Sequence, residues 1–352
     1  TTSQGNQASG AGTSQGQTNG AAEKPVVASQ GAVLYDVNNN RFLFEQNADT
    51  RYYPASITKL MTALLVLENS NLNDTVTFSE SAVSNLESGA VTLKIKAGDK
   101  FSVKDCLYAL LLKSANEVAN GLAEHVSGSV SGFADLMNQK AASLGCTNTH
   151  FVNPNGLNST EHYTTARDMA LIAKAAFENP TLSQIASTIS YDFPATASVP
   201  TVRKLTIGHK MISSANAEYY QGIVGGKTGY TSLAGNTLVT CAKRGDMTLI
   251  AVVLNGHLTH YTDTKAMLDF GFGNFQSLKI SEFETTYTSL DNDMTIAGMT
   301  AKDTISLDLD EDSRIVIPKS AGFSDAVPHL SYTLDRNAPS NAIAQVNYTY
   351  GD

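Results

Sequence analysis

Ser56 and Lys59 are the residues whose types and spacing most clearly suggest chemistry. They form the only Ser-x-x-Lys of the chain. Positions three apart on a helix share a face, so the hydroxyl and the amine can meet. A serine becomes a good nucleophile when a base removes its proton, and a desolvated lysine can be that base. A helix start also offers free N–H groups for an oxyanion. An N-cap serine beside a surface lysine is the alternative reading of this motif alone.

A second polar motif, Ser114-Ala115-Asn116, lies between two helical runs. A hydroxyl and a carboxamide held in a turn can relay protons and bind a peptide bond. The tripeptide recurs at 214–216, but that copy falls in a loop outside the helical block. We therefore take Ser114 and Asn116 as the candidates, with a simple polar turn as the alternative.

The third motif is Lys227-Thr228-Gly229, at a predicted strand. A cation and a hydroxyl on an edge strand suit a carboxylate, and the glycine lets a bound backbone approach closely. A phosphate-binding P-loop would need glycine at position 221, where the chain has Gln221. The motif therefore favours carboxylate binding over nucleotide binding.

The hydrophobic pattern predicts the elements that position these motifs. Residues 31–37 and 41–47 flank three asparagines and predict a β-hairpin. A helix is predicted over 56–69, with Ser56 at its N-cap after Pro54-Ala55. Further strands are predicted at 220–231, 234–244 and 246–256, and a closing helix at 261–275. The sheet therefore takes strands from both ends of this region, which predicts an α/β layer.

Helical signals dominate between those strands, at 103–113, 117–126, 132–145 and 165–179, so we expect an inserted helical subdomain over about 75–180. Residues 1–24 contain no aromatic or branched aliphatic side chain and predict a disordered Ser/Gly/Gln-rich linker. The main domain is expected over 25–276. Short strand signals separated by turn residues, at 277–290, 303–310, 313–319 and 342–350, predict a small all-β domain over 277–352.

Composition excludes several classes of protein. The formal net charge of −9 and the few basic runs argue against nucleic-acid binding. Three widely spaced cysteines exclude a disulfide framework and predict buried free thiols. The chain has no run of 18 or more apolar residues, so we expect no membrane-spanning helix. His257 and His260 lack further ligands for zinc, so we expect no metal and no cofactor. The low charged fraction of 16% favours an extracytoplasmic location.

Together and in this order, the three motifs match the set found in penicillin-recognising serine enzymes. The chain most resembles the low-molecular-mass penicillin-binding proteins, the serine-type D-alanyl-D-alanine carboxypeptidases. The resemblance covers roughly residues 28–275, and 277–352 is similar to the family's C-terminal domain. It implies a β-lactamase/transpeptidase-like sheet flanked by helices. The blocks that carry it are YYPASITKLMTALLVLE, LLKSANEVANGLAEH, THFVNPNGL, TARDMALIAKAAF and GGKTGYTSLAGNTLV.

The resemblance also implies catalytic roles. Ser56 would be the acylated nucleophile, Lys59 its general base, and Ser114 the relay of a proton to the leaving D-alanine. The backbone N–H groups of Ser56 and Tyr230 would form the oxyanion hole. The reaction implied is removal of the terminal D-alanine from peptidoglycan stem pentapeptides through an acyl-enzyme, and β-lactam antibiotics would acylate the same serine.

Substrate-binding roles follow in the same way. Asn116 would bind the substrate peptide, and Lys227 with Thr228 its terminal carboxylate, beside Gly229. Many family members carry an arginine where this chain has His260, so we expect weaker carboxylate binding here. An ordinary imidazole would gain charge, and strengthen binding, as the pH falls toward 6. Arg203 or Lys204 is an alternative cation.

The resemblance further implies a bacterial cell-envelope enzyme, secreted or associated with the membrane. The family's C-terminal amphipathic anchor is absent from this chain, so peripheral membrane association through an anchor outside it stays open. A β-lactamase is one alternative function, but no glutamate between Asn116 and Lys227 has an asparagine four residues later, as class A enzymes do. A catalytically inert cell-wall-binding protein on the same fold is the other alternative, although all three motifs are intact.

Overall fold

The computed structural model describes residues 23–84, 86–290, 295–296, 299–300, 305–335, 338 and 340–351. The linker predicted for residues 1–24 lies outside this range except for its last two residues. The three cysteines are buried free thiols, as the sequence predicts. No helix among the described residues is both long and apolar enough to cross a lipid bilayer.

A five-stranded antiparallel sheet forms the centre of the molecule, in the order β2-β1-β9-β8-β7. Its strands come from both ends of the region, as predicted, and its middle strand is buried on both faces. Val252 packs into the core on one face and its neighbour Val253 into the core on the other. The strands are β1 (Gly31–Asp36), β2 (Arg41–Gln46), β7 (Ile223–Thr231), β8 (Gly235–Arg244) and β9 (Met247–Gly256).

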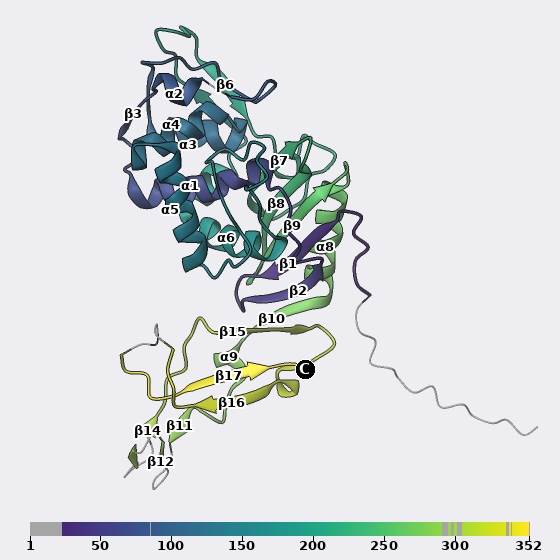
Figure 1. The fold of residues 1–352 in the computed structure, drawn as a ribbon. Coiled ribbons are helices and arrows are strands. Elements are labelled where there is room, and N and C mark those ends of the chain that lie inside the picture. The colour runs from purple at the N-terminus through teal and green to yellow at the C-terminus, as the bar shows by residue number, and fades with distance from the viewer. Residues whose placement is uncertain are drawn as a thin grey trace, which may run out of the picture.

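Helix α8 (His260–Asn274) covers one face of the sheet (Figure 1). Its Met267 and Leu268 are fully buried against strands β1, β8 and β9. Asp263, in the first turn, accepts hydrogen bonds from the backbone N–H groups of Ala28 and Ser29 at 3.1 and 2.9 Å. The segment that precedes β1 is therefore fixed to the start of α8.

The opposite face carries the helical block, which shares one continuous apolar core with the sheet (Figure 1). Its first elements are the 3₁₀ turn η1 (Ala55–Thr58) and helix α1 (Lys59–Asn69). Around α1 pack α2 (Glu80–Val83), α3 (Val103–Tyr108), the π-helical turn η2 (Ala109–Lys113), α4 (Asn116–Ser127), α5 (Val130–Ser143), α6 (Ala166–Glu178) and α7 (Pro180–Ala186). Two antiparallel strand pairs that the pattern did not reveal lie beside the block, together with the 3₁₀ turn η3 (Lys210–Ile212). They are β3 (Thr75–Thr77) with β4 (Lys100–Ser102), and the hairpin of β5 (Ser190–Phe193) with β6 (Arg203–Thr206).

Small two-stranded sheets make up the C-terminal part (Figure 1). The domain boundary expected between residues 276 and 277 falls inside strand β10 (Phe275–Lys279). The strand region expected at 277–290 is not one strand, because the short helix α9 (Ile280–Phe283) interrupts it. Arg314 of β15 pairs with Asp246 at 3.1 Å, in the turn between β8 and β9. The elements are β10 (Phe275–Lys279) with β15 (Arg314–Pro318), β11 (Ser289–Leu290) with β14 (Ile305–Ser306), β12 (Thr295–Ile296) with β13 (Met299–Thr300), β16 (Val327–Ser331) with β17 (Gln345–Thr349), α9 (Ile280–Phe283) and the 3₁₀ turn η4 (Phe323–Asp325).

Candidate active site

Ser56 lies in the 3₁₀ turn η1, directly before α1, so its prediction as a helix N-cap is wrong. The preceding Ala55 is buried and has a left-handed backbone with φ of 52°. This conformation is costly for a residue with a Cβ and persists where surrounding contacts impose it. Here Thr237 of β8 donates a hydrogen bond of 2.8 Å to the carbonyl of Pro54. The sheet therefore fixes the turn that presents the Ser56 hydroxyl.

Lys59 is fully buried, and its Nζ contacts three oxygen atoms. These are Ser56 Oγ at 2.9 Å, Asn116 Oδ1 at 2.8 Å and the backbone oxygen of Asn155 at 2.5 Å. Burial, reinforced by the charge of Lys227, holds the pKa of Lys59 well below its usual range. A neutral amine has two N–H donors and one lone pair. The two carbonyl oxygens can accept only from N–H, so in the neutral form the lone pair faces the serine hydroxyl.

Asn155 is a contributor that the sequence did not indicate. It lies in the block THFVNPNGL, residues 149–157, which resembles the family, but a backbone carbonyl has no side-chain signature. The side chain of Asn155 donates to Asn120 Oδ1 at 3.0 Å and accepts from the N–H of Leu157 at 2.9 Å. Thr62 of α1 donates to the carbonyl of Pro154 at 2.6 Å. These bonds fix the peptide whose oxygen meets Lys59.

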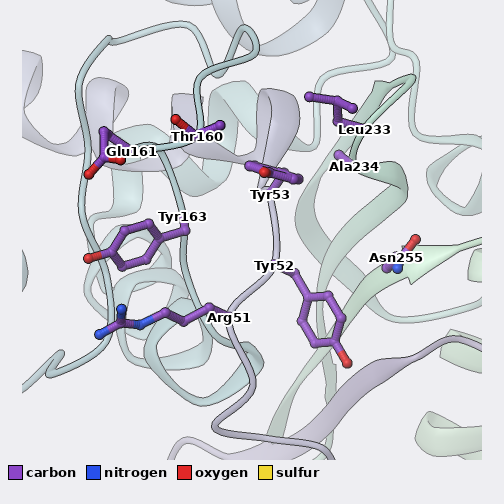
Figure 2. A pocket seen from close by; sticks show the side chains of 9 residues that line it. All are labelled: Arg51, Tyr52, Tyr53, Thr160, Glu161, Tyr163, Leu233, Ala234 and Asn255. Atoms are coloured by element: carbon purple, nitrogen blue, oxygen red, sulfur yellow. The ribbon is translucent and has the colours of Figure 1, made fainter.

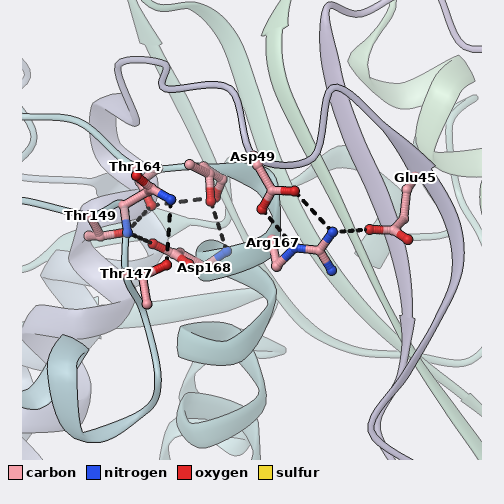
Figure 3. Close-up of polar contacts among 9 residues, drawn as sticks. Glu45, Asp49, Thr147, Thr149, Thr164, Arg167 and Asp168 are labelled. Atoms are coloured by element: carbon pink, nitrogen blue, oxygen red, sulfur yellow. Dashed lines mark hydrogen bonds and ion pairs between the residues drawn. The ribbon is translucent and has the colours of Figure 1, made fainter.

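The first turn of α6 anchors the longer loop that contains Asn155 (Figure 3). Asp168 accepts hydrogen bonds of 2.8 Å from Thr149 Oγ1 and from the N–H of Asn148. Its neighbour Arg167 forms an ion pair of 2.7 Å with Asp49 and a second with Glu45 of β2. Both contacts tie α6 to its surroundings, so the loop leading to Asn155 starts from a fixed position.

Ser114 and Asn116 lie where π-helical η2 ends and α4 begins. Ser114 has φ of 64°, and its buried Oγ has no hydrogen-bond partner among the described residues. Asn116 contacts Lys59 through Oδ1, while its Nδ2 donates to the carbonyl of Val91 at 3.0 Å. One Nδ2 proton remains for a substrate. Lys113 is exposed. The rejected copy at 214–216 lies in a turn after η3, where Asn216 donates to the carbonyl of Lys210.

Lys227 and Gly229 bring strand β7 against η1. Lys227 is 2% exposed, and burial lowers its pKa to about 7. Its Nζ donates to the backbone oxygen of Thr228 at 2.8 Å. A methyl group added at Gly229 would lie 2.8 Å from the backbone nitrogen of Ser56, so only glycine allows this approach. Tyr230 follows with its side chain 67% exposed.

His260 is half-buried at the start of α8, and its Nδ1 has no partner among the described residues. Burial, followed by the charge of Lys210, lowers the pKa of His260, while Asp263 and Glu218 oppose the shift. The expectation of an ordinary imidazole is therefore wrong, because the ring stays neutral to a lower pH. Of the alternative cations, Arg203 donates instead to the carbonyl of Leu93.

His209 is a second buried imidazole near this edge. Its Nε2 lies 2.7 Å from Thr240 Oγ1 of β8. Burial, together with the charge of Lys227, lowers the pKa of His209 to about 3. A methyl group added at Gly226 would overlap its ring. This neutral ring therefore fills the space behind β7 next to Lys227.

A cavity of about 480 Å³ opens beside the site (Figure 2). Tyr53, three residues before Ser56, lies between Tyr163 on one side and Leu233 on the other. Leu233 and Ala234 belong to the turn that follows β7. The cavity therefore continues from the end of β7 that lies beyond Tyr230. Its lining residues are Arg51, Tyr52, Tyr53, Thr160, Glu161, Tyr163, Leu233, Ala234 and Asn255.

The structure brings Ser56 and Lys59 together with Asn116 and places strand β7, which carries Lys227-Thr228-Gly229, against Ser56. These three motifs together are the set found in the penicillin-recognising serine enzymes. The model of the D-alanyl-D-alanine carboxypeptidase family matches residues 18–257. The chain therefore belongs to this family.

Individual relatives agree with this assignment. D-alanyl-D-alanine carboxypeptidase DacF of Bacillus subtilis is 33% identical over 71% of this chain, and the match spans 63% of DacF, which is less than two thirds of its length. A D-alanyl-D-alanine carboxypeptidase of a Streptomyces species is 34% identical over 72% of this chain and 90% of its own. A crystal structure titled as a Streptomyces DD-transpeptidase superposes with a TM-score of 0.66 at 31% identity, covering 71% of this chain and 99% of that one.

Proposed function

We propose that the protein is a serine-type D-alanyl-D-alanine carboxypeptidase that acts on peptidoglycan stem peptides outside the cytoplasm. The observation that carries the proposal is the buried amine of Lys59 at 2.9 Å from the Ser56 hydroxyl, with its other contacts on two carbonyl oxygens. Such an amine accepts the serine proton and so activates the nucleophile.

In the acylation step, Ser56 Oγ attacks the carbonyl of the penultimate D-alanine while Lys59 takes the hydroxyl proton. The backbone N–H groups of Ser56 and Tyr230 stabilise the oxyanion, and the close approach of Gly229 to Ser56 supports this pairing. As the peptide bond breaks, Ser114 passes its hydroxyl proton to the nitrogen of the leaving D-alanine and takes the proton held by Lys59, which leaves Lys59 neutral. Water attacks the ester, with Lys59 again as base, and releases the shortened peptide and the free serine.

The substrate would lie beside β7, with its terminal carboxylate at Lys227 and Thr228. Lys227 is suited to this role because its buried ammonium has a single hydrogen bond among the described residues, to a carbonyl oxygen. His260 adds little positive charge at neutral pH. From the scissile bond near Gly229, the upstream stem residues would pass Tyr230 and enter the cavity of Figure 2. A β-lactam would acylate Ser56 in the same place.

Domain roles are part of the same proposal. Residues 25–276 were expected to form the enzyme, but β10 (Phe275–Lys279) pairs with β15, so the enzyme would end at about residue 274. About 75–180 would be the helical subdomain that supplies Ser114 and Asn116. The β-rich domain would run from Phe275 to the last described residues, and 1–24 would be a spacer.

Mass spectrometry of muropeptides incubated with the purified protein tests the function directly. We expect pentapeptide stems to lose one D-alanine, and the Ser56→Ala variant to leave them intact. Cleaved cross-links would indicate endopeptidase activity instead, and new cross-links transpeptidation. Labelled penicillin should attach to the wild type and not to Ser56→Ala. Rapid release of hydrolysed penicillin would indicate a β-lactamase, and absence of labelling an inert protein.

A further inference from the structure

Glu117 is a buried carboxylate next to the catalytic asparagine that the mechanism above does not use. It is 1% exposed in the first turn of α4, one residue after Asn116. Its Oε1 accepts a hydrogen bond of 2.5 Å from the N–H of Leu93. Backbone N–H groups of Lys94 and Ile95 also interact with this carboxylate. The side chain of Glu117 therefore holds the N–H of Leu93 in the 91–95 loop, while its buried Oε2 has no hydrogen-bond partner among the described residues.

The same loop holds Asn116 in return. The carbonyl of Val91 accepts from both the backbone N–H and the Nδ2 of Asn116, at 2.9 and 3.0 Å. Asn116 Oδ1 is thereby directed at Lys59 Nζ. Because Glu117 fixes the loop and the loop fixes Asn116, a displacement of the loop would be felt at the general base.

Arg203 holds the loop from the other side. It extends from β6, lies over the ring of Phe193 at 5.0 Å and donates from Nη1 to the carbonyl of Leu93. Leu93 is thus held on both sides, by Glu117, which accepts from its N–H, and by Arg203, which donates to its carbonyl oxygen. Arg203 and Glu117 also attract each other electrostatically.

Charge is the second link between Glu117 and the site. The groups that act electrostatically on Lys59 are Lys227 of β7, which opposes its protonation, and Glu117, which favours it. His162 lies 2.9 Å from Thr58 Oγ1, but burial lowers its pKa to about 3, so it is neutral. Glu117 directly follows Asn116, whose Oδ1 contacts Lys59 Nζ at 2.8 Å, so it is a negative charge placed to offset Lys227 at the general base.

We propose that Glu117 is a positioning residue with two separable actions: its carboxylate fixes the 91–95 loop that orients Asn116, and its charge sets the pH at which Lys59 becomes a competent base. The proposal rests on the function proposed above, because it takes Lys59 as the base.

The test is the pH profile of penicillin acylation, measured as the second-order rate constant between pH 5 and 8. This quantity reports ionisations of the free enzyme. Glu117→Gln keeps an oxygen for the N–H of Leu93 but removes the charge. On the acidic side of the profile, the rate rises as Lys59 loses its proton; we call this rise the acidic limb. We expect the acidic limb of Glu117→Gln to move about one pH unit lower, because losing the negative charge makes Lys59 easier to deprotonate. Burial raises the pKa of Glu117 itself, so the shift should shrink toward pH 5.

Three further variants separate charge from position. Glu117→Asp keeps the charge on a shorter side chain, so its acidic limb should match the wild type while the rate falls at least about tenfold. Arg203→Met should also lower the rate without moving the limb. The matched control is Glu124→Gln on the same helix. Its carboxylate accepts a hydrogen bond from Ser79, away from the 91–95 loop, so the variant should leave both the rate and the acidic limb unchanged.

Each result with the Glu117 variants tests one action of Glu117, and a separate result tests the proposed function. A Glu117→Gln limb that coincides with the wild type would overturn the charge action, and an unchanged Glu117→Asp rate would overturn the loop action. If circular dichroism shows that Glu117→Gln does not fold, Glu117→Asp tests both actions. Its acylation rate tests the positional action. The acidic limb of its pH profile tests the charge action, because a shift of that limb with the charge retained would contradict that action. A wild type that penicillin does not label would instead refute the proposed function.

Discussion

Gly156 offers the sharpest test of how the active-site turn is held. It has φ of 83°, and a methyl group there would overlap the backbone carbonyl of Ala55 and lie 3.0 Å from Thr58 Oγ1. Ala55 directly precedes Ser56, so the loop that supplies the carbonyl of Asn155 packs without a gap against the turn that supplies the nucleophile. Gly156→Ala should therefore push these two catalytic elements apart.

Gly145 is a matched control for this substitution. Its φ of 84° is nearly the same, but nothing lies within 4 Å of a methyl group placed there. Both variants should lose about 1–2 kcal/mol from the left-handed backbone. Gly156→Ala should lose a further ~1–3 kcal/mol from overpacking. At roughly 2–4 °C per kcal/mol, Gly145→Ala should melt a few degrees below the wild type and Gly156→Ala lower still.

Activity should separate the two variants more clearly than stability. A displacement of about 1 Å at a reacting group can cost about 10²-fold in rate. We expect penicillin acylation to fall by that order in Gly156→Ala and to stay within about twofold of the wild type in Gly145→Ala. The assay is stopped-flow acylation below both melting temperatures. Equal acylation rates for the two folded variants would refute the contact between the Asn155 loop and η1 as a determinant of catalysis.

Two further predictions concern the carboxylate side of the site. Because the pKa of Lys227 is about 7, its ammonium loses charge as the pH rises through that value, and KM for a D-Ala-D-Ala peptide should increase between pH 7 and 9; a flat KM over this range would contradict the assignment. His260→Arg should lower KM with little change in kcat, because a contact remote from the scissile bond stabilises ground and transition states about equally. The improvement of the wild-type KM below pH 8 should come from Lys227 alone, because the lowered pKa of His260 keeps that ring neutral there; an unchanged KM in His260→Arg would show that residue 260 does not face the carboxylate.

The sequence predicted the parts of this molecule that depend on local spacing. The Ser56–Lys59 pair needs only one helical turn to meet, so even a wrong N-cap assignment left the two groups together. The central sheet was also predicted, because β8 and β9 are long apolar runs that have few other ways to be buried. The hairpin of β5 and β6 was missed, since the nine-residue connection between the two strands carries no tight-turn signal.

The rest of the site depends on contacts between distant segments, which spacing cannot reveal. The carbonyl of Asn155 reaches Lys59 across 96 positions, and any residue type could present that oxygen. Glu117 reads as an ordinary acidic residue in a first helical turn, where it would favour the helix dipole. Only the folded chain shows that its carboxylate is buried under the 91–95 loop. The lowered pKa of His260 has the same origin, because burial is set by the packing of α8.

Two buried lysines facing one active site need environments that divide their roles. Lys59 is surrounded by oxygens that accept from a neutral amine, and the charge of Lys227 disfavours its protonation. Lys227, with a pKa of about 7, retains a substantial charged fraction at neutral pH. A bound carboxylate would stabilise that charge and at the same time cancel part of its repulsion on Lys59. Lys59 would then accept the Ser56 proton more readily at the moment a correct substrate is in place. Groups whose environments drive their pKa values apart are how one site holds a base and a cation together.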